Sequence, residues 1–235
     1  MSSELRFEGG GTEAILTLKP SPRARVMRLR VDARTGAVIL TYPRRVSERK
    51  ALQWASKQRE WIETALANVP ASMPIVAGAE LPLYGIAHLV DWSVDRPRAV
   101  RVEDCRILVG GPVEGLEQRV LRWLKQHARA VLDAETREFA AKAGVAVTRV
   151  GIGDPVSRWG SCSSSGAIRY SWRLILTPEW VRRATVAHEV AHRVHMNHGP
   201  QFHALVEELL GADPKPARLW LRREGAAVHR IGRLG

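Results

Sequence analysis

The chain has 235 residues, of which 45% are hydrophobic and 26% charged, and these ordinary globular values allow one domain or two small ones. Residues 1–20 contain no apolar segment typical of a secretory signal, and no apolar run approaches the roughly 20 residues that span a bilayer, so neither secretion nor a membrane anchor is indicated. Two cysteines exclude a disulfide framework and a cysteine-based metal cluster, and we expect a cytoplasmic protein.

Residues 19–50 carry much of the net charge of +12. This segment holds ten lysines and arginines against two acids, Asp32 and Glu48, which gives a local charge of +8. A dense basic patch attracts polyanions through counterion release and electrostatic steering, so nucleic acid is one candidate partner. The alternative is a solvated, arginine-rich surface, since a high pI alone is a weak sign of nucleic-acid binding.

The first expected elements are a strand pair and a helix. Basic and apolar residues alternate over residues 26–31, which is the period of a half-buried strand. Turn-forming residues follow at 32–36, and residues 37–42 can return as the partner strand. Ser47 is then the expected N-cap of a helix that runs to about residue 68.

Further short strands are expected before the middle of the chain. They are predicted at residues 81–84, 88–92 and 106–109. The sequence Gly-Gly-Pro at residues 110–112 is the best candidate for a domain boundary. We therefore expect a small, basic, β-rich α+β module over residues 1–110 and a second domain over residues 111–235.

The second domain is expected to begin with a long helix over about residues 113–143, because apolar residues recur there at spacings near 3.6. Gly144 ends this helix. A strand at residues 145–152 and a hairpin-like segment at residues 158–176 follow, and Pro178 starts the next helix. The whole chain is therefore predicted to be an α+β protein.

The next helix carries the most informative motif. His188 and His192 are four residues apart, so on a helix both imidazoles project from one face, as two ligands of a tetrahedral zinc ion require. Glu189 follows the first histidine, where a carboxylate can act as a general base on a metal-activated water. The residues between them are small or aliphatic, which suits a helix that runs through a core.

A catalytic zinc site needs a third protein ligand. His198 lies six residues after His192, the spacing found in H-E-x-x-H-x-x-G-x-x-H sites, where the helix ends and the chain turns back. His195 stands at the glycine position of that pattern, but Asn197 tolerates a left-handed backbone and allows such a turn after a helix that ends near Met196. The other candidates for this ligand are His195, His203, Glu207 and Glu208.

Several segments around this motif follow one another in a specific order. They are RWGSCS at residues 158–163, WRLILTP at residues 172–178, the motif itself, and the pair Asn197-His198. Together with the N-terminal strands and the helix containing Trp61, they resemble the YgjP-like metallopeptidase family, whose members look like distant relatives of the SprT-like zinc proteases. The resemblance covers most of the chain.

The resemblance implies a zincin-like C-terminal domain in which His188, His192 and His198 bind zinc and Glu189 is catalytic. It also implies that a sheet edge before the motif helix lines the cleft, so residues 158–162 or 169–174 could pair with an extended polypeptide substrate. The candidates for stabilising a developing oxyanion are Arg158, Tyr170, His195 and His203.

We therefore expect a zinc-dependent metallopeptidase in which Glu189 takes a proton from the attacking water and returns it to the leaving amine. Two alternatives stay open. One is a metal-dependent nucleotide or phosphoester hydrolase, which the arginine-rich charge would suit. The other is a nucleic-acid-binding module whose zinc site is auxiliary.

Overall fold

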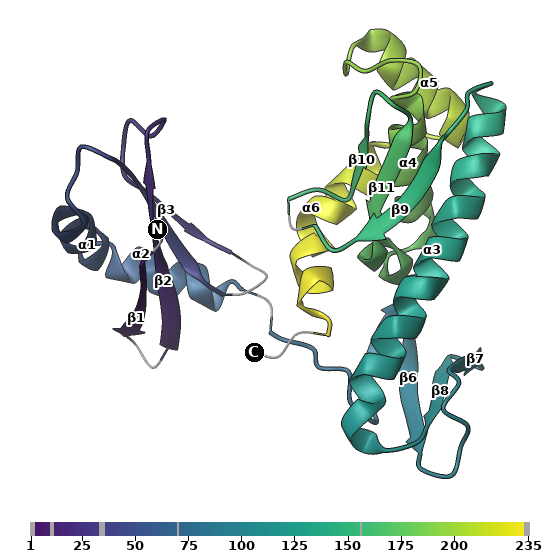
Figure 1. Cartoon of the computed structure of the whole chain (residues 1–235), viewed down its shortest axis with the longest axis horizontal. Helices are drawn as coiled ribbons and strands as arrows, with labels where there is room; N and C mark the ends of the chain where they lie inside the picture. Colours follow the sequence, from purple (N-terminus) through teal and green to yellow (C-terminus); the bar gives the residue numbers. More distant parts are fainter. Residues whose placement is uncertain (1–2, 10–11, 33–35, 70, 156, 233–235) are drawn as a thin grey trace. The chain divides into compact units, whose positions relative to one another are not determined.

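The computed structural model describes residues 3–9, 12–32, 36–69, 71–155 and 157–232. The chain divides into two compact units, Met1–Ser72 and Met73–Leu234, which we call unit 1 and unit 2 (Figure 1). Both units combine helices with small mixed sheets, so the predicted α+β class is confirmed.

Unit 1 contains a four-stranded sheet and two helices. Its elements are β1 (Ser3–Gly9), β2 (Thr12–Ser21), β3 (Arg28–Val31), β4 (Val38–Pro43), α1 (Glu48–Ser56) and α2 (Arg59–Ala67). The sheet order is β1-β2-β4-β3, with β2 and β4 parallel and the other neighbours antiparallel. The predicted strand pair is confirmed as β3 and β4, while residues 33–35 of its turn lie outside the described residues. The sequence did not predict β1 and β2.

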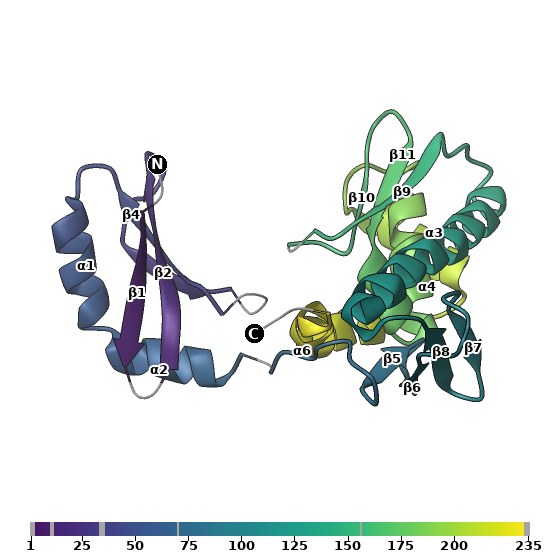
Figure 2. The same cartoon turned by 60° about the horizontal axis from the view of Figure 1, so that its bottom comes forward.

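The two helices of unit 1 cover one face of its sheet (Figure 2). Ser47 caps α1 as predicted, since its Oγ accepts a hydrogen bond from the N–H of Lys50 at 3.4 Å. The single helix predicted to residue 68 is two helices, because the N–H groups of Lys57 and Gln58 bond to carbonyls three residues back and tighten the turn. The buried core of unit 1 consists of Leu16, Leu18, Val38, Leu40, Tyr42, Ala51, Ala55 and Ile62.

Unit 2 contains two small sheets and the longest helix of the described residues. Its elements are β5 (Glu80–Leu83), β6 (Ile86–Ser93), β7 (Arg101–Glu103), β8 (Arg106–Gly110), η1 (Val113–Gly115), α3 (Leu116–Lys142), β9 (Arg149–Gly153), β10 (Gly160–Cys162), β11 (Ala167–Ser171), η2 (Trp172–Leu176), α4 (Glu179–Ala191), α5 (Pro200–Leu210) and α6 (Lys215–Arg230). The sheet orders are β5-β6-β8-β7 and β10-β11-β9. Helix α3 runs past both sheets and packs against β8 at one end and β9 at the other (Figure 1).

Most elements predicted for this part of the chain are present. The three short strands are β5, β6 and β8, and α3 ends before Gly144, whose φ is +64°. The strand predicted from residue 145 begins only at Arg149. The segment 158–176 forms β10 and β11 as predicted, but its last five residues form the 3-10 helix η2, which is wholly buried. The sequence did not predict β7.

The division between the units differs from the boundary predicted at residue 110. Residues 73–110 share a single hydrophobic core with α3 and α4, to which Leu81, Val90 and Ile107 contribute. The turn between β5 and β6 also bonds directly to η2, because the N–H of Tyr84 donates to the carbonyl of Ile175 at 2.8 Å. The Gly-Gly-Pro sequence is a local turn inside unit 2, and turn chemistry alone does not show whether a core continues across it.

Two buried arginines hold the helices of unit 2 in place. Arg182 of α4 donates to both carboxylate oxygens of Glu135 on α3, at 2.8 to 3.1 Å. Arg173 of η2 donates to Asp154 and also to the backbone carbonyls of Val228 and Ile231 at the end of α6. These contacts tie α4 to α3 and the end of α6 to η2, and both α4 and α6 contribute to the candidate site.

Helices that could cross a membrane are not found in the described parts of the chain, because none is both long enough and apolar enough.

Candidate metal centre

Helix α4 presents a polar side and an apolar side. Val186, Ala187 and Val190 are fully buried in the core of unit 2, which leaves His188 and His192 together on the opposite side. The ring centroids of these two histidines are 5.0 Å apart. The predicted placement of both imidazoles on one helix face is therefore what the structure shows.

The helix ends earlier than predicted. Its last residue is Ala191 rather than one near Met196, and His192 is the C-cap, with φ −64° and ψ −14°. Because this backbone is still helical, His192 keeps the four-residue relation to His188. Asn197 is not among the described non-glycine residues with a positive φ. The chain therefore turns back without the left-handed conformation that the sequence suggested at this residue.

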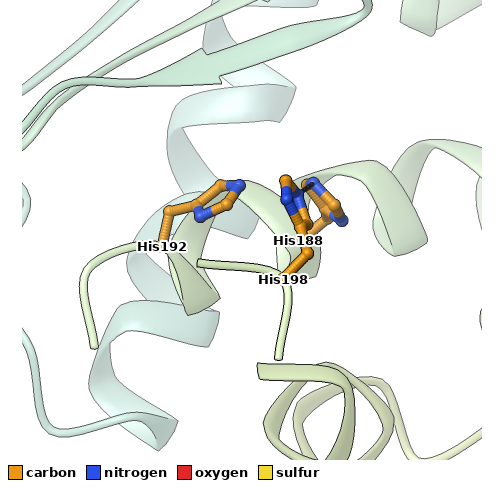
Figure 3. A group of neighbouring side chains, drawn as sticks. All are labelled: His188, His192 and His198. Atoms are coloured by element: carbon orange, nitrogen blue, oxygen red, sulfur yellow. Dashed lines mark hydrogen bonds between the residues drawn. The ribbon is translucent and has the colours of Figure 1, made fainter. Parts of the chain in front are cut away.

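The segment after α4 brings His198 back to the other two histidines. One ligating nitrogen of each ring lies within 4.8 Å of the others, and the Nε2 atoms of His198 and His188 are 3.2 Å apart (Figure 3). The buried ring of Phe202 on α5 lies under all three, with centroid distances of 4.6 to 4.9 Å. Phe202 is thus an apolar ring against which all three imidazoles pack.

The donor set fits a zinc ion. Tetrahedral coordination with Zn–N bonds of about 2.0–2.1 Å places neighbouring nitrogens about 3.3 Å apart, close to the separation of His188 and His198. The Nδ1–H of His192 donates to the carbonyl of His195 at 3.1 Å, which leaves Nε2 of His192 free to bind a metal. This backbone contact is the usual way in which a metal-binding histidine is oriented.

The protonation of the rings also suits ligation. Burial, followed by the charges of His192 and His198, lowers the pKa of His188 to about 4. Burial likewise lowers the pKa of His192. Both rings are therefore neutral at pH 7, and neutral imidazole is the form that binds a metal.

The rival candidates for the third ligand are not part of this cluster. Within the described residues, the only group of three or more potential ligands near enough to share an ion is His188, His192 and His198. The ring of His203 lies 6.4 Å from that of His198, and His195 contacts His192 through its backbone carbonyl. Glu207 and Glu208 are exposed on α5.

Glu189 lies directly beside the histidines and is only 6% exposed. Burial raises the pKa of Glu189 to about 7, and the positive charge of Arg158 acts in the opposite direction. A carboxyl group with a pKa near neutrality can both accept and donate a proton under ordinary conditions. A cation held by the histidines would favour the carboxylate form.

A pocket of about 270 Å³ opens next to His188 and Glu189. Its walls are mainly apolar and come from α4, α5 and α6, together with Trp159 and Gly160 at the start of β10. Besides His188 and Glu189, the polar residues in its wall are Arg158, Thr185, His203 and Arg218. The contribution of α6 was not foreseen from the sequence, since no motif in residues 215–230 indicated a site.

Tyr170, which the sequence offered as an oxyanion donor, and the neighbouring Cys162 do not suit a role in the candidate chemistry. Tyr170 is fully buried, its hydroxyl contacts Oγ1 of Thr136 at 3.0 Å, and burial raises its pKa, so it is a core residue rather than an oxyanion donor. Cys162 is a free, half-buried thiol whose pKa is raised by burial, which makes it a weak nucleophile. Arg158 and His203 remain as candidate donors because both line the pocket.

A helix-borne histidine pair, a third histidine and an adjacent carboxylate form the arrangement typical of metal-dependent hydrolases. The family model described as YgjP-like, metallopeptidase domain matches residues 25–224. The chain therefore belongs to the YgjP-like metallopeptidase family, as its sequence predicted. No curated protein and no solved structure matches the chain.

Proposed function

We propose that this protein is a zinc-dependent metallopeptidase in which His188, His192 and His198 bind the metal and Glu189 is the general base. The convergence of three imidazole nitrogens within 4.8 Å of one another, beside a buried carboxyl group, is the observation that carries the proposal. Three protein ligands leave one coordination position for water, which is the pattern of catalytic rather than structural zinc sites.

His188, His192 and His198 would hold the zinc ion, which would supply a bound water with a pKa of about 7 and polarisation of a carbonyl group. The protein's own residues then handle the protons. Glu189 removes a proton from the attacking water and delivers it to the amine that leaves, and burial, which raises the pKa of this carboxyl group, helps it to hold the proton between the two steps. Arg158 and His203 line the adjoining pocket, where either can donate to the developing oxyanion.

A polypeptide substrate fits the edge of the sheet next to the histidines. Strand β10 is one of the two edge strands of the β10-β11-β9 sheet, and its first residue, Gly160, packs against Glu189. An extended chain that pairs with β10 would therefore place a peptide bond near the candidate base. The sequence offered residues 158–162 and 169–174 for this role, and the strand order favours the first segment.

The first alternative is a metal-dependent nucleotide or phosphoester hydrolase. Arg158 and Arg218 line the pocket and join none of the ion pairs between described residues, which favours this alternative. However, phosphoryl transfer usually relies on Mg²⁺ held by carboxylates, whereas this cluster consists of imidazoles. The test compares purified, zinc-loaded protein on an unfolded protein and on nucleoside triphosphates, with and without a chelator. Chelator-sensitive proteolysis supports the proposal, and chelator-sensitive nucleotide hydrolysis without proteolysis refutes it.

The second alternative concerns the basic segment of unit 1. Arg28 and Arg30 alternate along β3 with residues that pack on the core, so both side chains are exposed on the face opposite the helices, and Lys19 is exposed on β2. Such a surface suits binding to phosphates of nucleic acid. A mobility-shift titration of the whole chain, compared with the R28Q/R30Q double variant at several salt concentrations, tests this binding. If the chain does not bind nucleic acid, or binds it independently of salt concentration, this alternative is refuted.

A further inference from the structure

The outer face of the β10-β11-β9 sheet carries a second, larger hollow. Alternate residues of these strands, such as Val150 and Ile168, are buried against the helices, and the residues between them face outward. On that outward face lies a hollow of about 580 Å³ that Arg149, Arg158 and Arg169 line. Three arginines around one concave surface make it strongly positive.

Small residues line the hollow between these arginines. Gly151, Ser161 and Ala167 line the same hollow, and Arg169 pairs in register with Gly151 and Ser161 across the sheet. A Cβ atom at Gly153 would lie 2.7 Å from Nε and Nη2 of Arg169, so the guanidinium group lies directly over the backbone of this glycine.

Carboxylates of the described residues form no ion pair with these arginines, although the charge of Arg158 also acts on Glu189. Arg149, Arg158 and Arg169 are exposed and take part in none of the ion pairs between described residues. Other arginines of unit 2 behave differently, since Arg96 and Arg137 pair with neighbouring aspartates. The guanidinium groups over the sheet are therefore available to an external anion.

The hollow adjoins the candidate active site. Arg158 lines both this hollow and the pocket beside His188 and Glu189. A chain that pairs with β10 would send alternate side chains to opposite faces of the sheet, because side chains in a strand alternate with period two. One set would face the arginines, and the other would face α4 and the mainly apolar pocket.

We propose that the outer face of the β10-β11-β9 sheet selects polypeptide substrates that carry acidic side chains at alternate positions next to the cleaved bond, with apolar residues between them. This inference rests on the proposed peptidase function and adds the substrate class. The guanidinium group suits the role because its fork of donors binds a carboxylate through two hydrogen bonds.

Binding can be measured without turnover in the full-length, zinc-loaded E189Q variant. The probes are three labelled peptides with the same apolar residues and with Glu, Gln or Lys at the alternate positions, followed by fluorescence anisotropy. We expect the Glu peptide to bind about tenfold more tightly than the Gln peptide, which corresponds to about 1.4 kcal/mol, and the Lys peptide to bind most weakly.

Variants of the sheet test whether the arginines cause this preference. The R149Q/R169Q double substitution should bring the Glu and Gln peptides to nearly equal affinity, and R169E should favour the Lys peptide. The matched control is R122Q/R129Q, because Arg122 and Arg129 are exposed on α3 and line neither hollow. This control carries the same kind of charge change and should keep the tenfold preference.

Three results have separate meanings. If the E189Q variant without substitutions in the sheet binds the Glu and Gln peptides with equal affinity, the inference is overturned. Tighter binding of a single-stranded oligonucleotide, lost in the R149Q/R169Q variant, also overturns it and assigns the hollow to nucleic acid. If the wild-type protein cleaves no peptide but still prefers the Glu peptide, the proposed hydrolysis is refuted while the acid-selecting surface is supported.

Discussion

Gly160 approaches Glu189 so closely that a Cβ atom at residue 160 would lie 2.5 Å from Oε1 and 2.6 Å from Cγ of Glu189. The first residue of the edge strand therefore packs directly on the candidate base. Because the contact reaches Cγ as well as the carboxylate, the end of the Glu189 side chain could not avoid a methyl group by a small rotation.

The G160A variant should accordingly lose activity by about 100-fold or more, since a displacement of about 1 Å in a catalytic group can have an effect of this size. Zinc content should stay unchanged, because Gly160 does not belong to the histidine cluster. Metal analysis and peptidase assays on the same preparation measure both effects. The control is G199S, where an added Cβ meets nothing within 4 Å. Full activity of G160A would contradict the assigned position of Glu189.

The E189Q variant should retain zinc and lose turnover. Glutamine keeps the size of the side chain but cannot accept the proton, and general acid–base groups typically contribute about 10²- to 10⁴-fold to the rate. Zinc stoichiometry and the rate of hydrolysis of an unfolded protein provide the measurement. A variant that keeps more than a small fraction of wild-type activity would show that another group is the base.

The H198A variant should lose zinc. Loss of a group that merely orients a ligand typically weakens metal binding about 10- to 100-fold, so loss of a ligand itself should cost more. Dialysis against a metal buffer followed by metal analysis measures the affinity. The matched control is H203A, since the ring of His203 lies 6.4 Å from that of His198 and outside the cluster. If H203A loses zinc and H198A does not, the ligand assignment is wrong.

The R173M variant should be strongly destabilised. Arg173 is 2% exposed and donates to the carbonyls of Val228 and Ile231, each of which would lose a donor worth about 1–3 kcal/mol. Urea denaturation gives the change in the free energy of unfolding. R137M is the comparison, because its partner Asp133 lies on the exposed side of α3 and such pairs contribute little. Equal stability of the two variants would contradict this account.

The stability of the metal-free protein should depend on His127 below neutral pH. Burial, followed by the charge of Arg182, lowers the pKa of His127 in the folded state. The unfolded chain then binds a proton at higher pH than the folded one, so stability is full above about pH 6.5 and falls as the pH drops below it.

The H127F variant should remove part of this dependence. Its ring can keep the stacking on Trp123, whose centroid lies 4.9 Å away at an interplanar angle of 10°. Urea midpoints at about pH 7.5 and about pH 5.5 should therefore differ less for the variant than for the wild type. If the urea midpoints at the two pH values differ more for H127F than for the wild type, the prediction is wrong.

The elements that could be predicted are those whose determinants lie within a few residues of one another in the sequence. The capping Ser47, the long α3 and the pair β3 and β4 were predictable because caps, periodicity and tight connections act over a few residues. The division of the chain was not, since it depends on whether residues 73–110 share a core with α3, and no local pattern reports that.

The sequence by itself determined the pairing of His188 and His192 and the neighbouring Glu189, because the period of a helix places residues four apart on one side whatever surrounds it. The spacing of the motif also favoured His198 as the third histidine, whereas only the tertiary structure brings its ring to the other two and packs Phe202 against all three.

The tertiary structure likewise decided that Gly160 packs on Glu189 and that three arginines surround one hollow. These contacts join segments that are far apart along the chain. They exist only after the helices and sheets have packed, so no spacing in the sequence encodes them.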